Sequence, residues 1–244
     1  MVTTTTTPIV LIGVPTSDRK KDVNYPWAIF CKNSLTYPNR ELFAVDNSFD
    51  TTYHRIFKQM GIETAYVSPK GKLAFQVIAE CQNLIRQKVL REKFDYLFFL
   101  ETDLLYPPID IIERLLAFQV QVVGCMYLTG TEQKNFMINH ICEDYNAETN
   151  ESTITNFVQP LAEDFKLIGT NQLLWVSSVG FGCTLIHRSV LERISFKASQ
   201  THASDSFFFN ECAEKLISVY LDTDTYINHF NNDWGVFINK SVIV

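Results

Sequence analysis

The sequence predicts an α/β fold in which a mostly parallel central sheet is flanked by helices. Short apolar runs bounded by turn residues are typical of buried strands, and helical periodicity between such runs is typical of a chain that alternates strands with helices. Ligands of these sheets bind beyond the carboxyl ends of the strands. The strands expected in the first half lie at residues 8–15, 42–45, 96–100 and 121–127.

The N-terminal strands and the first helix follow from simple patterns. Residues 8–15 (PIVLIGVP) form an apolar run closed by Gly and Pro, and residues 42–45 (LFAV) lead directly into Asp46. The stretch between these strands is interpreted as a loop. From residue 73 to about residue 91, apolar side chains recur with the helical period, which predicts an amphipathic helix.

The middle of the chain predicts the centre of the sheet. Residues 96–100 (YLFFL) are continuously apolar, too short for a helix and too uniform for a strand with one exposed face. Two prolines then open a helix at residues 109–118, because Pro is favoured in the first turn of a helix. Residues 121–127 supply the next strand.

The second half has a less regular pattern. Residues 129–164 are polar and weakly periodic, which fits either a loop that covers a substrate or an insertion with a hairpin. Residues 175–186 resemble a strand interrupted by two glycines, where the backbone can approach a ligand closely. Residues 206–216 read as a helix, and residues 218–221 as a last strand that leads towards Asp222, Asp224 and His229.

Size, composition and charge indicate one acidic globular domain. The 244 residues are 46% hydrophobic and 20% charged, with a net charge of -6, so we expect a flexible tail at residues 1–8 and a single domain at residues 9–244. The acidic balance disfavours docking on a nucleic acid, although the cluster Arg19, Lys20 and Lys21 can contact phosphates.

Membrane and secretion signals are missing from the sequence pattern. The longest apolar stretches fall far below the roughly 20 residues that span a bilayer, and the threonine-rich start lacks the apolar core of a signal peptide. The six cysteines contain no CxxC pair, which argues against a zinc cluster. We therefore expect a cytoplasmic protein, in the host cytoplasm if it is viral, with reduced thiols.

The strongest functional signal is a pair of carboxylates directly after the central strand. Glu101 and Asp103 are two residues apart and can point to the same side. Paired hard oxygen ligands suit Mn²⁺ or Mg²⁺, which also bind the phosphate oxygens of a ligand. A diphosphate leaving group needs such a cation to neutralise its charge. Alternatively, the two residues begin a solvated loop or favour the next helix electrostatically.

With residues 94–127 in view, the chain resembles the GT-A glycosyltransferases, particularly the short family-2-like enzymes of phages and bacteria. In that family an acidic pair, usually DxD, follows the central strand and binds the metal and the donor diphosphate. The resemblance therefore implies a donor site at Glu101, Thr102 and Asp103, with Glu in place of the first Asp. The implied donor is a nucleotide sugar, most simply a UDP-sugar.

The resemblance also implies further donor residues. Asp46, in the segment AVDNS at residues 44–48, matches an Asp that contacts the nucleotide base or ribose. Asn83 and Arg86 lie on the predicted helix where related sequences carry donor-binding residues, although an exposed helix face explains them equally well. His229 matches a histidine that completes the metal site, against the alternative of an ordinary core or surface histidine.

On the acceptor side, the glycine-containing segment at residues 179–188 is similar to a strand beside the acceptor, or is a kinked strand without such a role. Asp205 matches the carboxylate that serves as catalytic base in inverting members. A base of this kind removes the proton from the attacking acceptor hydroxyl. The alternative for Asp205 is a helix N-cap, a position that Asp favours.

Taken together, these features predict a metal-dependent glycosyltransferase that binds a nucleotide sugar. The acceptor stays open among a glycan, a protein, a small molecule and a modified nucleic acid, the last as a viral DNA-modifying variant. Two rivals are a non-catalytic nucleotide- or glycan-binding module and a metal-dependent phosphohydrolase of the haloacid-dehalogenase type. Glu101 argues against the second rival, because that family places its nucleophilic Asp there. Closure of part of residues 129–164 over the donor is a further hypothesis.

Overall fold

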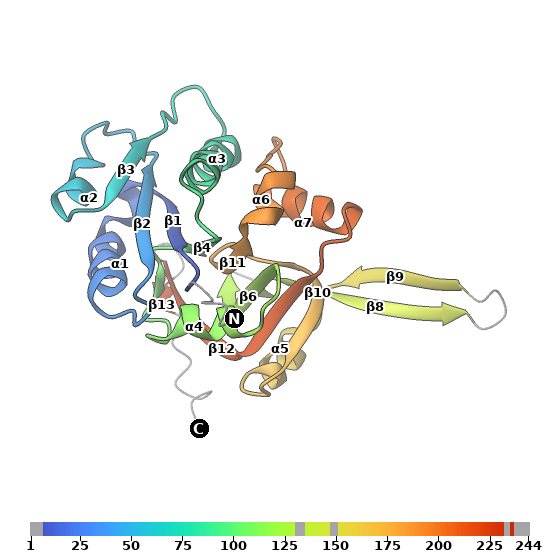
Figure 1. Cartoon of the computed structure of the whole chain (residues 1–244). Coiled ribbons are helices and arrows are strands. Elements are labelled where there is room, and N and C mark those ends of the chain that lie inside the picture. Colours follow the sequence, from blue (N-terminus) through green and yellow to red (C-terminus); the bar gives the residue numbers. More distant parts are fainter. Residues whose placement is uncertain (1–6, 130–134, 147–150, 232–234, 237–244) are drawn as a thin grey trace, which may run out of the picture.

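One twisted sheet with helices on both faces organises the protein. The computed structural model describes residues 7–129, 135–146, 151–231 and 235–236, so that most of the expected N-terminal tail lies outside the described residues. Neighbouring strands follow the order β3-β2-β1-β4-β11-β6-β12-β10-β8-β9 (Figure 1). Three short strands pair off this path, β13 (Gly235–Val236) and β5 (Leu104–Leu105) with β12 and β7 (Asn135–Phe136) with β6.

The N-terminal half of the sheet is parallel, as predicted. Strand β1 lies between β2 and β4 and runs parallel to both, and β2 continues in parallel to β3. These strands therefore end at one edge. Their bounds are β1 (Val10–Thr16), β2 (Arg40–Asp46), β3 (Glu63–Tyr66) and β4 (Tyr96–Leu100).

The other half makes the sheet mixed, and the expectation of a mostly parallel sheet is corrected there. Strand β11 runs antiparallel to both β4 and β6, and β10, β8 and β9 also pair antiparallel, while β12 runs parallel to β6. Antiparallel pairing needs no long crossover, and β8 and β9, like β10 and β11, follow one another without a helix between them. The bounds are β6 (Val122–Thr129), β8 (Ile138–Asn146), β9 (Glu151–Phe157), β10 (Leu173–Val179), β11 (Cys183–His187) and β12 (Val219–Asn231).

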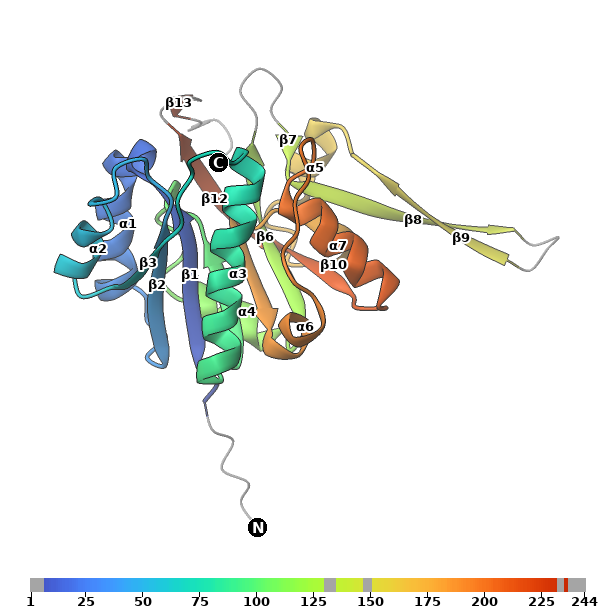
Figure 2. The same ribbon diagram turned by 90° about the horizontal axis from the view of Figure 1, so that it is seen from above.

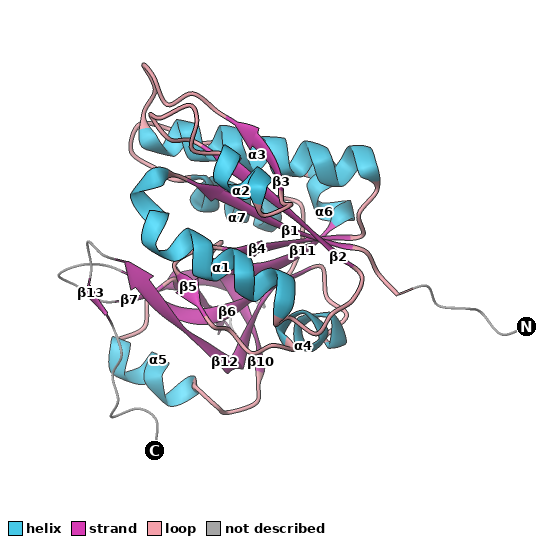
Figure 3. Ribbon diagram, turned by 90° about the vertical axis from the view of Figure 1, so that its left-hand side faces the viewer, coloured by secondary structure: helices cyan, strands magenta, loops and turns pink. Residues whose placement is uncertain are grey.

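Helices cover both faces of the sheet (Figure 3). Two clusters of buried apolar side chains form the core. Helices α3 (Ala74–Glu92), α6 (Arg188–Arg193) and α7 (Ser204–Glu214) pack over one face, where Ile85, Val190 and Phe208 join the first cluster. The second cluster lies against the other face. It gathers side chains from α1 (Lys21–Asn33), α2 (Arg55–Gln59) and α4 (Ile111–Ala117).

Helix α1 replaces the loop expected between the first two strands. Its apolar side chains Val23, Trp27 and Cys31 follow the helical spacing and are buried against the sheet. Pro26 lies inside this helix, where proline removes a backbone hydrogen bond. Burial of the apolar face outweighs that cost, and the proline in the middle of the segment hid the helical pattern in the sequence.

The polar segment at residues 129–164 contains a hairpin, which confirms one of the two alternatives. Strands β8 and β9 pair antiparallel and extend away from the body of the protein (Figures 1 and 2). Helix α5 (Leu161–Leu167) follows the hairpin. Residues 130–134 and 147–150 lie outside the described residues, so closure of this segment stays a prediction.

The interrupted strand at residues 175–186 is two separate strands, β10 and β11, joined by a glycine-containing turn. A Cβ atom on Gly180 would lie 1.9 Å from Tyr127 Oη, and a Cβ on Gly182 would lie 2.7 Å from Tyr127 Cζ. These glycines are therefore required by the close approach of the turn to Tyr127. The final strand is also longer than expected, because β12 continues through His229.

Within the described residues, none of the helices combines the length and the apolar character needed to cross a bilayer. The cysteines whose side chains are described, Cys31, Cys81, Cys125, Cys183 and Cys212, are buried free thiols.

Candidate functional site

A pocket opens where the parallel strands β1, β2 and β4 end. The pairing register aligns Thr16 with Asp46, and β4 lies on the other side of β1, so the segments that follow these strands meet at one edge. The pocket has a volume of about 370 Å³ and is lined by Pro15, Thr16, Ser17, Asp18, Arg19, Lys20, Asn47, Phe49, Pro69, Lys72, Ala74, Val77, Ile78 and Glu101. Its position agrees with the expected ligand-binding edge of such a sheet.

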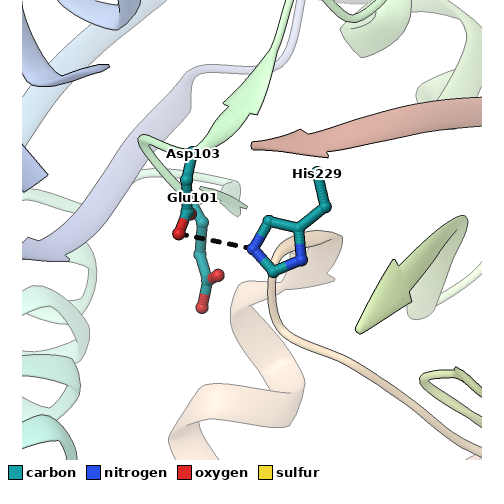
Figure 4. A group of neighbouring side chains, drawn as sticks. All are labelled: Glu101, Asp103 and His229. Atoms are coloured by element: carbon teal, nitrogen blue, oxygen red, sulfur yellow. Dashed lines mark ion pairs between the residues drawn. The ribbon is translucent and has the colours of Figure 1, made fainter. Parts of the chain in front are cut away.

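Glu101, Asp103 and His229 come together (Figure 4), and Glu101 also lines the pocket. One ligand atom from each side chain lies within 4.8 Å of the others. The His229 Nε2 atom is 3.3 Å from Asp103 Oδ2, and His229 Nδ1 lies 2.8 Å from the Leu128 carbonyl oxygen. These are the three residues that the sequence predicts as metal ligands.

Short backbone contacts bring the three side chains together from distant parts of the chain. Strand β5 follows Asp103 directly and pairs with β12, with Leu104 opposite His229. The Phe230 N–H donates to the Asp103 carbonyl at 2.6 Å. These contacts fix Asp103 beside His229.

Tyr127 links the two sides of the cluster, and sequence reasoning missed it. Its hydroxyl accepts a hydrogen bond from the Gly182 N–H at 2.9 Å, and the Gly182 carbonyl accepts one from the Glu101 N–H at 2.8 Å. The Tyr127 ring also meets the His229 ring edge to face, with centroids 5.7 Å apart. No local motif marks this tyrosine, because its role depends on the turn between β10 and β11.

Lys20 adds a positive charge to the acidic pair. Its Nζ atom lies 2.8 Å from Asp103 Oδ2 and 4.0 Å from Glu101 Oε2. The sequence marks Lys20 as part of a basic cluster able to contact phosphates, but it gives no sign that this lysine meets Asp103. That contact arises because β1 and β4 are parallel neighbours and end at the same edge.

The ionisation of the cluster follows from burial and from these neighbours. Burial acts to raise the pKa of Asp103, but the His229 hydrogen bond and the Lys20 charge lower it to about 2. Burial acts to lower the pKa values of His229 and Lys20, yet the nearby carboxylates raise both. At Glu101, desolvation outweighs the attraction of Lys20 and raises the pKa. Asp103 is therefore the more firmly ionised of the two carboxylates.

The cluster fits a hard divalent cation. Two carboxylates and an imidazole are acceptable ligands for Mn²⁺, and oxygen ligands suit Mg²⁺ as well. Asp103 Oδ1 is buried, and within the described part of the chain it accepts no hydrogen bond. A buried oxygen without a hydrogen bond destabilises the folded protein, and coordination of a cation would remove that penalty. The assignment of these side chains as metal ligands stays a prediction.

The residues expected to bind the nucleotide occupy different environments. Asp46 is fully buried, and its Oδ1 accepts the Ser48 N–H at 2.9 Å, so it shapes the turn after β2. Burial raises the pKa of Asp46. Asn47 and Phe49, from the same turn, line the pocket itself. The sequence pattern located this turn but could not tell which of its side chains face the pocket.

Thr102, Asn83 and Arg86 do not line the pocket. Thr102 is fully buried between the two acidic residues. The Asn83 side chain pairs with both backbone groups of Phe196, at 2.7 and 3.0 Å. The Arg86 guanidinium donates to the carbonyl oxygens of Leu191 and Ile194 at 2.6 and 2.9 Å. These last two side chains hold α3 against the segment around α6, and neither forms an exposed helix face.

Asp205 lies in the first turn of α7 and lines a second pocket of about 210 Å³. Ala203, not Asp205, occupies the N-cap position, which corrects the capping alternative. The Asp205 Oδ1 atom accepts the Ser206 N–H at 2.8 Å, and burial raises its pKa. Its charge also contributes to the raised pKa of Glu101, so the two carboxylates interact electrostatically.

Comparisons with known proteins identify the fold. No protein-family model and no curated protein matches the sequence. The chain is similar to the structure of the mannosyltransferase PcManGT from Pyrobaculum calidifontis in complex with GDP-Man and Mn²⁺, with 14% identity, a TM-score of 0.56, and coverage of 91% of this chain and 57% of that one. It is also similar to S. aureus TarS 1-349 in complex with UDP, with 13% identity, a TM-score of 0.53, and coverage of 91% and 59%.

These likenesses confirm the predicted GT-A fold. The chain spans less than two thirds of the length of either protein. At this level of identity the likeness establishes the fold alone, because one fold hosts many activities. The short family-2-like affiliation of this chain stays a prediction.

Proposed function

We propose that this protein is a metal-dependent glycosyltransferase that moves a sugar from a nucleotide-sugar donor, most simply a UDP-sugar, to an acceptor hydroxyl. One observation carries the proposal. A pocket lined by Arg19, Lys20 and Lys72 adjoins the cluster of Glu101, Asp103 and His229 at the carboxyl edge of the sheet. Basic side chains suit the phosphates, and the adjacent acidic cluster suits their metal ion.

The chemistry of the pocket lining favours one orientation of a bound nucleotide. Phe49 and Ile78 offer apolar surface for the base, with the Asn47 amide nearby to hydrogen-bond it. The diphosphate then points towards Lys20 and Glu101, which also line the pocket and join it to the acidic cluster. Glu101, Asp103 and His229 would hold the metal ion, which when bound neutralises the negative charge of the departing diphosphate.

The transfer step uses Asp205 as the proposed base. The acceptor oxygen attacks the anomeric carbon and forms the new glycosidic bond, while the bond from that carbon to the diphosphate oxygen breaks. The hydroxyl proton passes to the Asp205 carboxylate, and the nucleoside diphosphate leaves with the bonding electrons. The raised pKa of Asp205 makes it a stronger base than an exposed aspartate. The second pocket, which Asp205 lines, is the proposed acceptor side.

The two rival functions predict other behaviour. A phosphohydrolase of the haloacid-dehalogenase type needs an Asp nucleophile at the position of Glu101, and its motif follows the first strand, whereas this pair follows β4. A binding module would take up the nucleotide without turning it over. Turnover therefore separates the proposal from its nearest rival.

The proposal is tested by the release of nucleoside diphosphate. The protein is incubated with Mn²⁺ and a panel of UDP- and GDP-sugars, with mixed glycan, peptide and modified-DNA acceptors, and UDP or GDP release is followed with a coupled assay. We expect release from at least one donor, stimulated by one acceptor class and abolished by EDTA. Tight nucleotide binding without release for any donor and acceptor would favour the binding module instead.

Replacing Phe49 with Ala is expected to weaken UDP binding. The Phe49 side chain lines the pocket with 61% of its surface exposed, as a stacking surface for a base must be. Loss of one base–aromatic contact costs about 1–3 kcal/mol, or roughly 5- to 150-fold in affinity. Titration calorimetry with Mn²⁺ measures the change.

The control for this substitution is Tyr106→Ala, which removes another exposed aromatic side chain that is not among the residues lining the pocket. UDP affinity should be unchanged in that variant. Equal UDP affinity in Phe49→Ala and the wild-type protein would show that the base does not stack on Phe49.

A further inference from the structure

We infer that Lys20 is a built-in cation that competes with the divalent metal ion for the acidic cluster and transfers to the donor diphosphate when nucleotide and metal bind together. This inference rests on the proposed function and adds a coupling residue to it. The observation that carries it is the double contact of the Lys20 ammonium, at 2.8 Å from Asp103 Oδ2 and 4.0 Å from Glu101 Oε2.

The position of Lys20 lets its ammonium reach both the acidic cluster and a ligand in the nucleotide pocket. It ends the short 3-10 turn η1 (Asp18–Lys20), which connects β1 to α1 at the carboxyl edge of the sheet. Its side chain lines the nucleotide pocket, and 31% of the side-chain surface is exposed. The flexible four-carbon stem of lysine allows the charge to move without moving the backbone.

The ammonium and a metal ion compete for the same carboxylate, because Lys20 contacts Asp103 Oδ2 and the cation would also bind Asp103. Asp103 Oδ2 is shared by Lys20 and His229, and it is one of the few oxygens that the cluster can offer to an ion. A divalent cation bound to Asp103 would repel a lysine charge held against the same carboxylate. In the absence of nucleotide, the Lys20 charge therefore lowers the affinity of the cluster for the metal ion.

A diphosphate removes this conflict. It brings new negative charge into the pocket that Lys20 already lines, so the ammonium gains an anionic partner when it leaves Asp103. Nucleotide and metal ion then raise each other's affinity, because the nucleotide draws the Lys20 ammonium away from Asp103. Coupling of this kind acts equally in both directions, and typical values correspond to about 5- to 150-fold in affinity.

The test is Lys20→Met, which keeps an unbranched side chain one atom shorter and removes its charge. Mn²⁺ affinity is measured from the spin-resonance signal of free Mn²⁺, and UDP affinity is measured by calorimetry at saturating Mn²⁺. We expect Mn²⁺ alone to bind about 5-fold or more tightly and UDP to bind about 5-fold or more weakly. These changes of opposite sign distinguish competition from a simple loss of a phosphate ligand.

Two further variants keep the result interpretable. Lys21→Met removes the neighbouring exposed lysine, which makes no contact with the cluster among the described ion pairs, and should change neither affinity. Lys20→Arg keeps the charge and should retain the coupling. The melting temperature of Lys20→Met is compared with that of the wild-type protein to confirm that the variant folds. If Lys20→Met does not fold, Lys20→Arg still tests whether the charge is needed.

The outcomes separate this inference from the proposed function. If Lys20→Met leaves Mn²⁺ affinity unchanged or weakens it while the wild-type protein binds both ligands, Lys20 does not compete with the metal and the inference is overturned alone. If the wild-type protein binds neither Mn²⁺ nor UDP, the proposed function fails and the inference fails with it.

Discussion

The Asp103→Asn variant is expected to lose Mn²⁺-dependent nucleotide binding, with UDP affinity in Mn²⁺ falling by at least about 100-fold. Even residues that only orient metal ligands change metal affinity by about 10- to 100-fold, and Asp103 is expected to be a ligand itself. The substitution preserves shape but removes the charge that faces both His229 and Lys20. Titration calorimetry with UDP and spin resonance of free Mn²⁺ measure the two affinities.

A matched acid-to-amide change provides the control. Asp224 lies on β12, as His229 does, but its carboxylate faces Arg114 at 3.7 Å and does not belong to the metal-binding cluster. Asp224→Asn should bind Mn²⁺ and UDP as the wild-type protein does. Retention of Mn²⁺-dependent UDP binding in Asp103→Asn would refute its assignment as a ligand.

The Asp205→Asn variant is expected to lose turnover but still to bind the nucleotide-sugar donor. General base catalysis contributes about 10²- to 10⁴-fold, so kcat should fall within that range. UDP affinity in Mn²⁺ should change far less than kcat, because Asp205 lines the second pocket and not the nucleotide pocket. Glu214→Gln, at an exposed position on the same helix, is the matched control and should keep full activity.

The pH dependence of turnover gives Asp205 a second readout. A base must be ionised to accept a proton, and burial raises the pKa of this carboxyl. As the pH falls, kcat should therefore begin to drop at a higher pH than for an ordinary exposed aspartate. A variant that loses turnover equally at every pH without changing this acid limb would indicate a positioning role for Asp205.

The sequence predicted best the elements whose pattern is purely local. The continuous apolar run at residues 96–100 coincides with β4 (Tyr96–Leu100), and the helical period from residue 73 matches α3 (Ala74–Glu92). Helix α1 was not predicted because Pro26, in the middle of the segment, argues against a continuous helix. The antiparallel direction of β11 was not predicted either, because the residues of a strand do not specify which strands it pairs with.

Contacts within the site were predictable only in part. The resemblance to GT-A enzymes indicated Glu101, Asp103 and His229, and the structure brings these three together. Lys20 was visible only as a basic residue, because its contact with Asp103 depends on how β1 and β4 pair.

Polar positions on a helix are ambiguous for a similar reason. The sequence places Asn83 and Arg86 on a helix face that could bind a ligand or face solvent. In the structure both side chains hydrogen-bond backbone groups of the segment around α6. Periodicity gives the face on which a side chain lies, whereas the packing partner of that face is set by the tertiary fold.

The most direct test of the central claim is titration of UDP into the wild-type protein with Mn²⁺ and, separately, with EDTA, followed by the same pair of titrations with GDP. We expect one nucleotide to bind in Mn²⁺ and its affinity to drop by at least about 10-fold when the metal is removed. Equal affinity in EDTA would contradict a metal-assisted diphosphate site at Glu101, Asp103 and His229. Failure of both nucleotides to bind in Mn²⁺ would contradict the nucleotide-sugar donor itself.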